Sequence, residues 1–193
     1  MTIRPSILTT IRIVTWNDFG EASYIGPIHD ESEVRTASQV YCTAQTTPHE
    51  GFLNLLPYYI AKYKGQTPTI AKNQMQFWYR NAPVAAGDPC GVVGNGAGQT
   101  QYTPKDLLED NIFFSALLTA PAQVTVKIGD GPVATFSGQQ GINHWSTPFS
   151  GQTGVPVFSI LGGSNGTVAT GQGTPIVATV NGCANYNAYV GGF

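Results

Sequence analysis

Short runs of β-branched and aromatic residues, separated by glycine, proline and asparagine, fill the second half of the sequence and restrict its fold most. They occupy residues 111–118, 122–128, 132–136, 155–161, 166–170, 174–180 and 185–190. Runs of this length at near-regular spacing, bounded by turn residues, are typical of antiparallel strands. No helical periodicity follows Leu108, so the sequence predicts an antiparallel β-sandwich over residues 105–193.

The first half has a different pattern, in which strand and helix signals alternate. Nearly continuous apolar runs over 11–16 and 74–79 predict two strands. Between them, apolar residues at helical spacing predict a helix that is capped at Thr47 and kinked at Pro57. Strand, helix and strand in this order predict a parallel βαβ unit, and the glycine-rich residues 87–104 predict a linker to the sandwich.

Composition excludes several classes of protein. Nine Lys and Arg against eleven Asp and Glu give a net charge of -2, so the sequence predicts no nucleic-acid partner. No apolar run reaches the ~20 residues of a membrane span, so no membrane insertion is expected. Cys42, Cys90 and Cys183 are too few for a disulfide scaffold and form no CxxC pair. One bridge and a free thiol remain an alternative, and we expect no metal and no cofactor.

Two acids, Asp18 and Glu21, follow the first expected strand. In barrel enzymes this edge of a parallel strand holds catalytic groups. Trp16 and Tyr24 flank the acids with rings on which a sugar can stack, and Asn17 offers a donor and an acceptor to hydroxyls. Paired carboxyls among aromatic residues are what glycoside hydrolysis requires. On pattern alone, an Asn-Asp-x-Gly stretch is more often a structural turn, so both interpretations stay open.

Other residues are further candidates for functional roles. His49 at the helix start, and Tyr79 and Arg80 at the end of the second strand, would face the catalytic side of a barrel and contact substrate. Capping or solvation is an alternative for His49, and a domain interface is one for Arg80. Asn165 begins a glycosylation sequon. Residues 1–16 lack the apolar core of a signal peptide, so we expect either an intracellular protein or a missing N-terminus.

The sequence contains three segments in a set order: TWNDFGEASYIGP, PHEGFLNLLPYYIAKYKG and FWYR. Together with the glycine-rich sandwich they resemble the C-terminal half of fungal family 71 glycoside hydrolases, the α-1,3-glucanases or mutanases. The resemblance covers most of the chain and is densest over residues 13–80. It implies a (β/α)₈ barrel followed by a β-sandwich, an extracellular or cell-wall location, and inverting hydrolysis of α-1,3-glucan by Asp18 and Glu21. The family usually has serine where this chain has Ala22.

The chain is shorter than the fold that this resemblance implies. A (β/α)₈ barrel takes ~250 residues, whereas residues 1–86 resemble only its last two strand-helix units. The expected fold is therefore α/β plus all-β: a partial barrel over 1–86, a linker over 87–104 and a sandwich over 105–193. We expect the isolated chain to be inactive and to self-associate, because the apolar helix stripe and open strand edges need partners. Two hypotheses remain: an α-1,3-glucan hydrolase in its full-length form, or an inactive remnant with a carbohydrate-binding or structural role.

Overall fold

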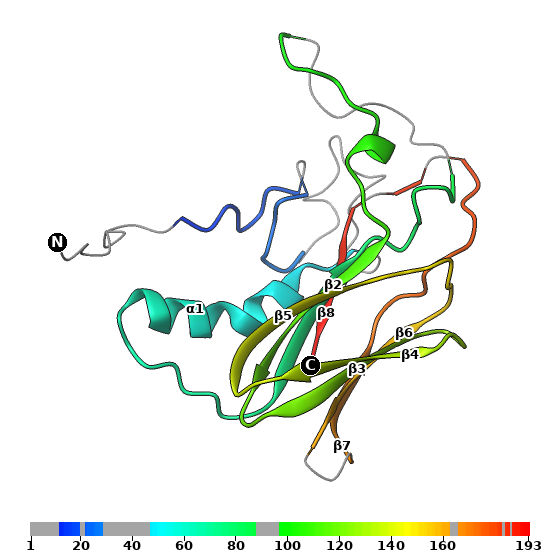
Figure 1. Cartoon of the computed structure of the whole chain (residues 1–193). Helices are drawn as coiled ribbons and strands as arrows, with labels where there is room; N and C mark the ends of the chain where they lie inside the picture. The colour runs from blue at the N-terminus through cyan, green and yellow to red at the C-terminus, as the bar shows by residue number, and fades with distance from the viewer. Residues whose placement is uncertain are drawn as a thin grey trace, which may run out of the picture.

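The structure is a computed structural model that describes most of the chain. Glu21, Asn165 and the three cysteines lie outside the described residues. In the part that is described, two four-stranded sheets pack face to face and one α-helix lies on the outer side of one sheet (Figure 1). The described residues are 12–19, 22–28, 47–87, 97–162, 166–182, 184–185 and 187–193.

All strand pairs in the two sheets are antiparallel. The first sheet has the order β5-β2-β1-β8, with β1 Gln74–Tyr79, β2 Asn111–Leu118, β5 Gly141–Pro148 and β8 Tyr189–Gly192. The second has the order β4-β3-β6-β7, with β3 Ala122–Ile128, β4 Val133–Gly138, β6 Pro156–Leu161 and β7 Thr167–Gln172. The expected antiparallel sandwich is therefore confirmed.

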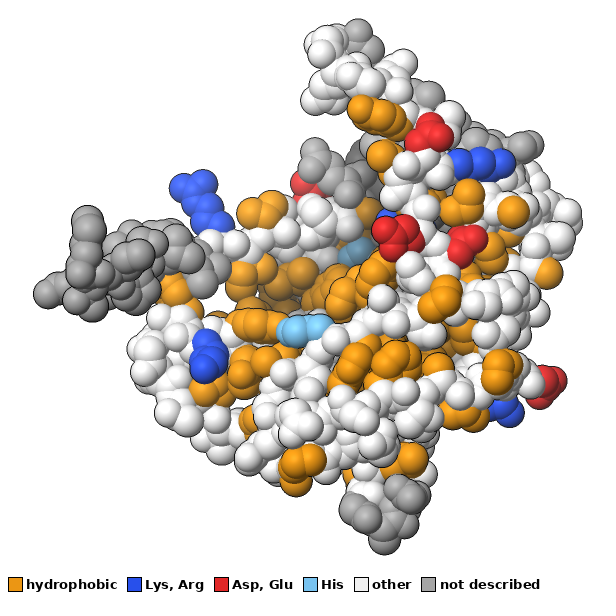
Figure 2. Space-filling model, viewed as in Figure 1, with side chains coloured by type: hydrophobic (Ala, Val, Ile, Leu, Met, Phe, Trp, Pro, Cys, Tyr) orange, Lys and Arg blue, Asp and Glu red, His pale blue; other side chains and the backbone are white. Residues whose placement is uncertain are grey.

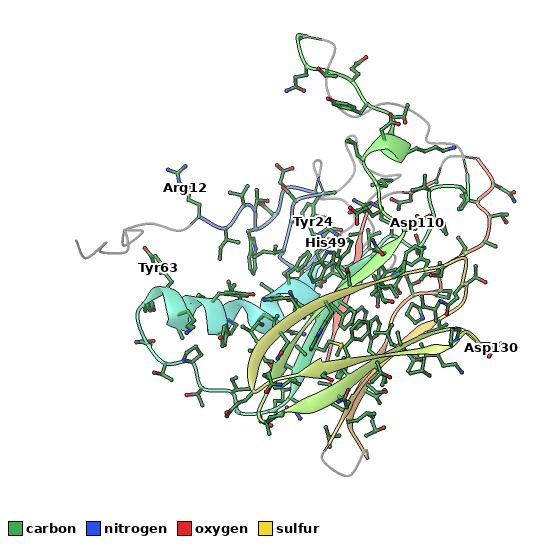
Figure 3. The ribbon with its side chains drawn as sticks, in the orientation of Figure 1. Arg12, Tyr24, His49, Tyr63, Asp110 and Asp130 are labelled. Carbon is green, nitrogen blue, oxygen red and sulfur yellow. The ribbon has the colours of Figure 1, made fainter. Side chains whose placement is uncertain are left out.

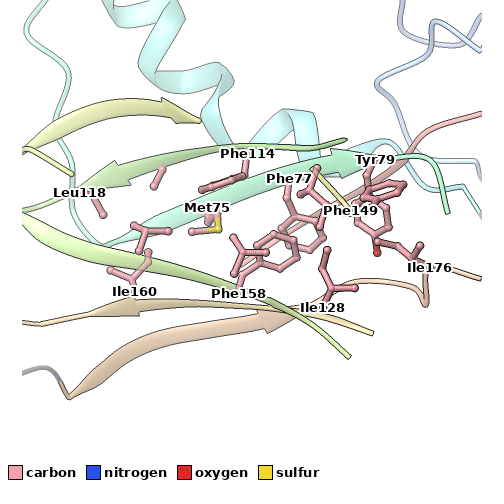
Figure 4. Close-up of a cluster of buried hydrophobic side chains, with 14 residues drawn as sticks. Met75, Phe77, Tyr79, Phe114, Leu118, Ile128, Phe149, Phe158, Ile160 and Ile176 are labelled. Atoms are coloured by element: carbon pink, nitrogen blue, oxygen red, sulfur yellow. The ribbon is translucent and has the colours of Figure 1, made fainter. Parts of the chain in front are cut away.

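The core lies between the two sheets and is rich in aromatic side chains (Figure 4). Phe77 of β1 stacks on Phe158 of β6 with ring centroids 3.9 Å apart, which joins the centres of the two sheets. Successive strand residues point to opposite faces, so Met75 and Tyr79 also face this core, whereas Trp78 faces outward. Each such aromatic side chain contributes about 1.5–3 kcal/mol through burial.

The strand β1 forms where the sequence predicts one, but its pairing differs. Its Phe77 lies opposite Phe114 of β2 on one side and Gly191 of β8 on the other, both antiparallel. The predicted parallel βαβ unit is therefore wrong for 74–79, which belongs to the sandwich. Residues 12–16 form no strand, and the described residues contain no parallel strand pair, so a partial barrel is not confirmed. An apolar run shows that a strand is buried but not which strand it will pair with.

Strands differ from the predictions at three places in the sandwich, and one of them is the run predicted at 185–190, where β8 begins only at Tyr189. The strand β5 was not predicted, because its sequence GINHWSTP is largely polar and only Trp145 packs against the core. Residues 174–180 form no strand, and only Ile176 makes an isolated bridge, with Gly154. Instead of pairing along a strand, Ile176 exchanges two backbone hydrogen bonds with Gly154.

The helical segment is built in two parts, a 3-10 helix η2 (Glu50–Leu55) and the α-helix α1 (Leu56–Tyr63). Pro57 lies in the first turn of α1, where a missing N–H is tolerated, and the helical segment changes from 3-10 to α just before it. The predicted cap at Thr47 is wrong, because the N-cap of η2 is His49, which makes no side-chain cap bond. A further 3-10 turn, η3 (Pro104–Asp106), precedes β2.

One face of α1 is apolar and partly exposed. Tyr59, Ile60 and Tyr63 are 45%, 40% and 41% exposed, and α1 has no buried residue. Together with Ile13 and Leu56 these side chains line an apolar hollow. Among the described residues, no helix is long and apolar enough to span a bilayer.

Candidate active site

The segment with the paired acids folds into a closed loop, here called the motif loop (described residues 15–19 and 22–26). The amide of Thr15 donates to the Ser23 carbonyl at 2.8 Å, and the amide of Ile25 donates back to the Thr15 carbonyl at 2.9 Å. The amide of Gly26 donates to the Trp16 carbonyl, also at 2.9 Å. Backbone hydrogen bonds therefore join residues 15–16 to residues 23–26, although neither segment forms a strand.

Asp18 is held at the turn of the motif loop through its backbone. Its amide donates to the hydroxyl of Thr15 at 2.8 Å, and its carbonyl accepts the Ser23 amide at 3.2 Å. Ala22 has a φ of 55°, in the left-handed region that costs an alanine about 1–2 kcal/mol. The side chain of Asp18 is half-buried.

Tyr24 anchors the motif loop to the rest of the molecule. Its side chain is 0% exposed, and its ring stacks on the His49 ring with centroids 3.9 Å apart and planes 6° apart. Its hydroxyl donates to the backbone carbonyl of Thr47, just ahead of η2. Phe19 packs on the same ring from within the loop, at 5.0 Å. Figure 3 shows Tyr24 and His49 side by side where the loop meets the start of the helical segment.

His49 links three parts of the chain. Its Nδ1 lies 2.8 Å from the Tyr24 carbonyl oxygen, and its Nε2 lies 3.0 Å from the carbonyl oxygen of Ala188, just before β8. Burial lowers the pKa of His49 below its usual value of 6.5, and hydrogen bonds to Tyr24, Ala188 and Asn187 oppose that shift. The histidine therefore connects the motif loop, the helical segment and the first sheet.

An open cavity of about 430 Å³ lies beside Tyr24 and His49, within the size range of small-molecule sites. Figure 2 shows the surface hollowed here, with hydrophobic side chains and a histidine on its floor. Asp18 does not line this cavity but is bonded to Ser23, which does. Burial lowers the pKa of Arg80, whose guanidinium remains a cation with several donors. The lining includes Val14, Ser23, Tyr24, His49, Phe52 and Arg80.

The structure brings Tyr24, His49 and Arg80 together around the cavity. Tyr24 and His49 are 0% and 3% exposed, so they support its wall, whereas Arg80 is half-buried and can reach a ligand. Trp16 is 57% exposed on the motif loop, and Asn17 beside it is exposed as well.

Tyr79 lies apart from the other candidates, inside the sandwich core. It is 2% exposed, and its hydroxyl donates to the Thr174 carbonyl. Burial raises its pKa. A side chain in this place has no surface for a sugar to contact, so we assign Tyr79 to the core. Sequence reasoning had grouped it with Arg80 because the two are adjacent in the chain.

Two cavity residues, Asn187 and Ala188, have no signal in the sequence that could have found them. The contact between His49 and Ala188 joins residues 139 positions apart. Phe52 was expected only as part of the apolar helix stripe. Among the described residues, no three His, Cys, Asp or Glu side chains gather as ligands for a metal ion.

Comparisons with known proteins agree with the motifs. The family model described as glycosyl hydrolase family 71 matches residues 2–193. A mutanase of Penicillium rubens is 33% identical over 183 residues, which are 94% of this chain and 38% of the mutanase. A glucan endo-1,3-alpha-glucosidase of Schizosaccharomyces pombe is 32% identical over 94% of this chain and 40% of its own length. An ascus wall endo-1,3-alpha-glucanase of the same yeast is 23% identical.

The chain spans about two fifths of the length of the first two relatives. No solved structure matches it. The family match nevertheless extends over nearly the whole chain and both halves of the sequence, which confirms the resemblance drawn from the motifs. The chain belongs to glycosyl hydrolase family 71.

Proposed function

We propose that the motif loop and its cavity form part of the active site of an enzyme that hydrolyses α-1,3-glucan. The observation that carries this proposal is the docking of the Asp18 loop, through Tyr24 and His49, onto a cavity that also holds the Arg80 cation. Three relatives are named as a mutanase or as endo-1,3-α-glucan-cleaving enzymes, and their substrate suits a site of carboxylic acids, aromatic rings and hydroxyl-binding groups.

Asp18 and Glu21 are the proposed catalytic acids. In an inverting glycosidase one carboxylic acid protonates the leaving oxygen and the other carboxylate activates water, across ~6.5–9.5 Å. The motif loop supports this role for Asp18, because its backbone is held from both sides while the turn remains near the surface. Trp16, which is exposed beside it, offers a ring for a sugar to stack on, and Asn17 offers its amide.

The remainder of the cleft is proposed to come from residues that correspond to the part of the relatives outside the matched segment. We infer from the family resemblance that residues 1–86, apart from β1, carry only the last part of a (β/α)₈ barrel, with a linker over 87–104 and the sandwich over 105–193. In this arrangement β1 leaves the barrel segment to join the sandwich sheet. A cell-wall or extracellular location and glycosylation at Asn165 belong to the same proposal.

A chimera tests the proposal. Residues 2–193 replace the matching segment of the Penicillium rubens mutanase, and release of reducing sugar from α-1,3-glucan is measured. Loss of a general acid or base costs about 10²–10⁴-fold in rate, so Asp18→Asn and Glu21→Gln should each reduce kcat by that factor. The matched control is Asp130→Asn, which removes an exposed carboxylate at the far end of the sandwich (Figure 3).

Two results would contradict the proposal in different ways. If the chimera is active and Asp18→Asn retains the rate of Asp130→Asn, Asp18 is not a catalytic acid. If the chimera folds and binds α-1,3-glucan but releases no sugar, while the parent mutanase does, the chain is a binding remnant, as the alternative hypothesis states.

A further inference from the structure

Both ring nitrogens of His49 face hydrogen-bond acceptors. The Tyr24 carbonyl oxygen is 2.8 Å from Nδ1 and the Ala188 carbonyl oxygen is 3.0 Å from Nε2. A neutral imidazole carries only one N–H, so it can donate to only one of the two carbonyls. The nitrogen that carries the proton donates to its carbonyl, and this decides whether the histidine holds the motif loop or the segment before β8.

We propose that His49 is a positioning residue, whose Nδ1–H donates to the Tyr24 carbonyl and thereby holds Asp18 in place. The proposal rests on the proposed function only in treating Asp18 as the group to be positioned. It replaces the expectation that the ring of His49 binds a sugar hydroxyl, since both nitrogens already face backbone oxygens.

A short path of bonds connects His49 to Asp18. The Tyr24 carbonyl that faces Nδ1 belongs to the residue next to Ser23, whose amide donates to the Asp18 carbonyl at 3.2 Å. The Ser23 carbonyl in turn accepts the amide of Thr15, whose hydroxyl accepts the Asp18 amide. Movement of the Tyr24 backbone would therefore move both groups that hold Asp18.

The other side of His49 is fixed to the sandwich. Ala188 precedes β8, the edge strand of the first sheet, which pairs with the inner strand β1. His49 itself is 3% exposed and stacks face to face on Tyr24, so its ring has little freedom to turn. The imidazole thus joins the motif loop to the segment that leads into the first sheet.

Two substitutions separate the ring nitrogens. The side-chain nitrogen of asparagine is as many bonds from Cα as Nδ1, and that of glutamine is as many as Nε2. His49→Asn therefore keeps a donor for Tyr24 and loses the one for Ala188, whereas His49→Gln does the reverse. Both variants remove the stacked ring equally, so each is the control for the other.

Hydrogen exchange of the 193-residue chain measures the outcome at the loop amides of Ser23, Ile25 and Gly26, which are bonded within the motif loop. We expect exchange in His49→Gln to be about 3- to 10-fold faster than in His49→Asn, the size of one lost neutral hydrogen bond. Exchange in β2 and β3 should be the same in both variants. Equal exchange of the loop in the two variants, or faster exchange in His49→Asn, would overturn the proposal.

A measurement on the unsubstituted chain covers the case in which both variants unfold. The ¹⁵N chemical shifts of the His49 ring report which nitrogen carries the proton, and the proposal requires a proton on Nδ1. A proton on Nε2 alone would overturn it. Neither readout uses glucan, so a failure of the proposed hydrolysis would leave these results unchanged. In an active chimera, His49→Gln should lower kcat more than it raises KM, and His49→Asn should recover most of the kcat.

Discussion

Replacement of Tyr24 by alanine should release the motif loop without unfolding the sandwich. The described loop residues contact the rest of the molecule through this side chain, which stacks on His49 and donates to the Thr47 carbonyl, and through the Tyr24 carbonyl, which faces Nδ1 of His49 and remains in the variant. The sandwich core, centred on the Phe77 and Phe158 pair, does not include Tyr24. The two parts should therefore respond separately to the substitution.

The expected effect follows from the burial of Tyr24. A fully buried aromatic side chain replaced by alanine loses about 3–5 kcal/mol, and Tyr24 is 0% exposed. Tyr24→Phe keeps the ring and removes only the hydroxyl, so it should lose about 0.5–1.5 kcal/mol for one hydrogen bond. Tyr63→Ala is the matched control, because Tyr63 is 41% exposed on α1 and its loss should change stability by no more than about 0.5 kcal/mol.

The assay is limited proteolysis of the motif loop together with thermal unfolding of the sandwich. Cleavage after Trp16 or Phe19 should accelerate by more than 100-fold in Tyr24→Ala, as a docking loss above about 3 kcal/mol requires. It should change little in Tyr63→Ala. If cleavage rates are equal in the two variants, or if the sandwich melts together with the loop, Tyr24 is not the anchor that the structure indicates.

Three further outcomes are expected. Because burial lowers the pKa of His49 in the folded chain, the neutral form favours folding. The resulting stability is present above pH 6.5 and falls as the pH drops through the lowered pKa. Chemical denaturation at each pH should show a steeper fall in the unsubstituted chain than in His49→Asn. Phe158→Ala should cost about 3–5 kcal/mol in unfolding free energy, and Val157→Ala, at an exposed site, much less. Ile60→Ser and Tyr63→Ser should lower the mass of any self-associated species in sedimentation, and an unchanged mass would exclude the α1 face.

The sandwich was the most predictable part of the fold. The predicted runs 111–118 and 122–128 coincide with β2 and β3, because their turn residues and alternation are local signals. The strand β5 was missed because its side chains are mainly polar, and its place depends on pairing with β2. The run at 74–79 was correctly predicted as a strand but given the wrong partners, since strand pairing is decided by distant residues.

The site was predictable only in part, for the same physical reason. The motif drew attention to Asp18 and its neighbours, and the structure shows Tyr24, His49 and Arg80 around one cavity. The roles of Tyr24 and His49 as a stacked pair depend on a contact across 25 positions, and the sequence contains no local signal for it. The helix start was also predicted wrongly, because Thr47 was expected to cap the helix but instead accepts the Tyr24 hydroxyl through its backbone carbonyl.

The central claim is that the cavity beside the motif loop receives α-1,3-glucan. The most direct measurement is an NMR titration of the 193-residue chain with a soluble α-1,3-linked glucose oligosaccharide, read at assigned backbone and side-chain signals. We predict that signals of Trp16, Tyr24 and Arg80 shift together, with a single binding constant, while signals at the distant Asp130 turn stay constant. Shifts confined to the sandwich strands, or the same response to a β-1,3-linked oligosaccharide, would contradict the claim.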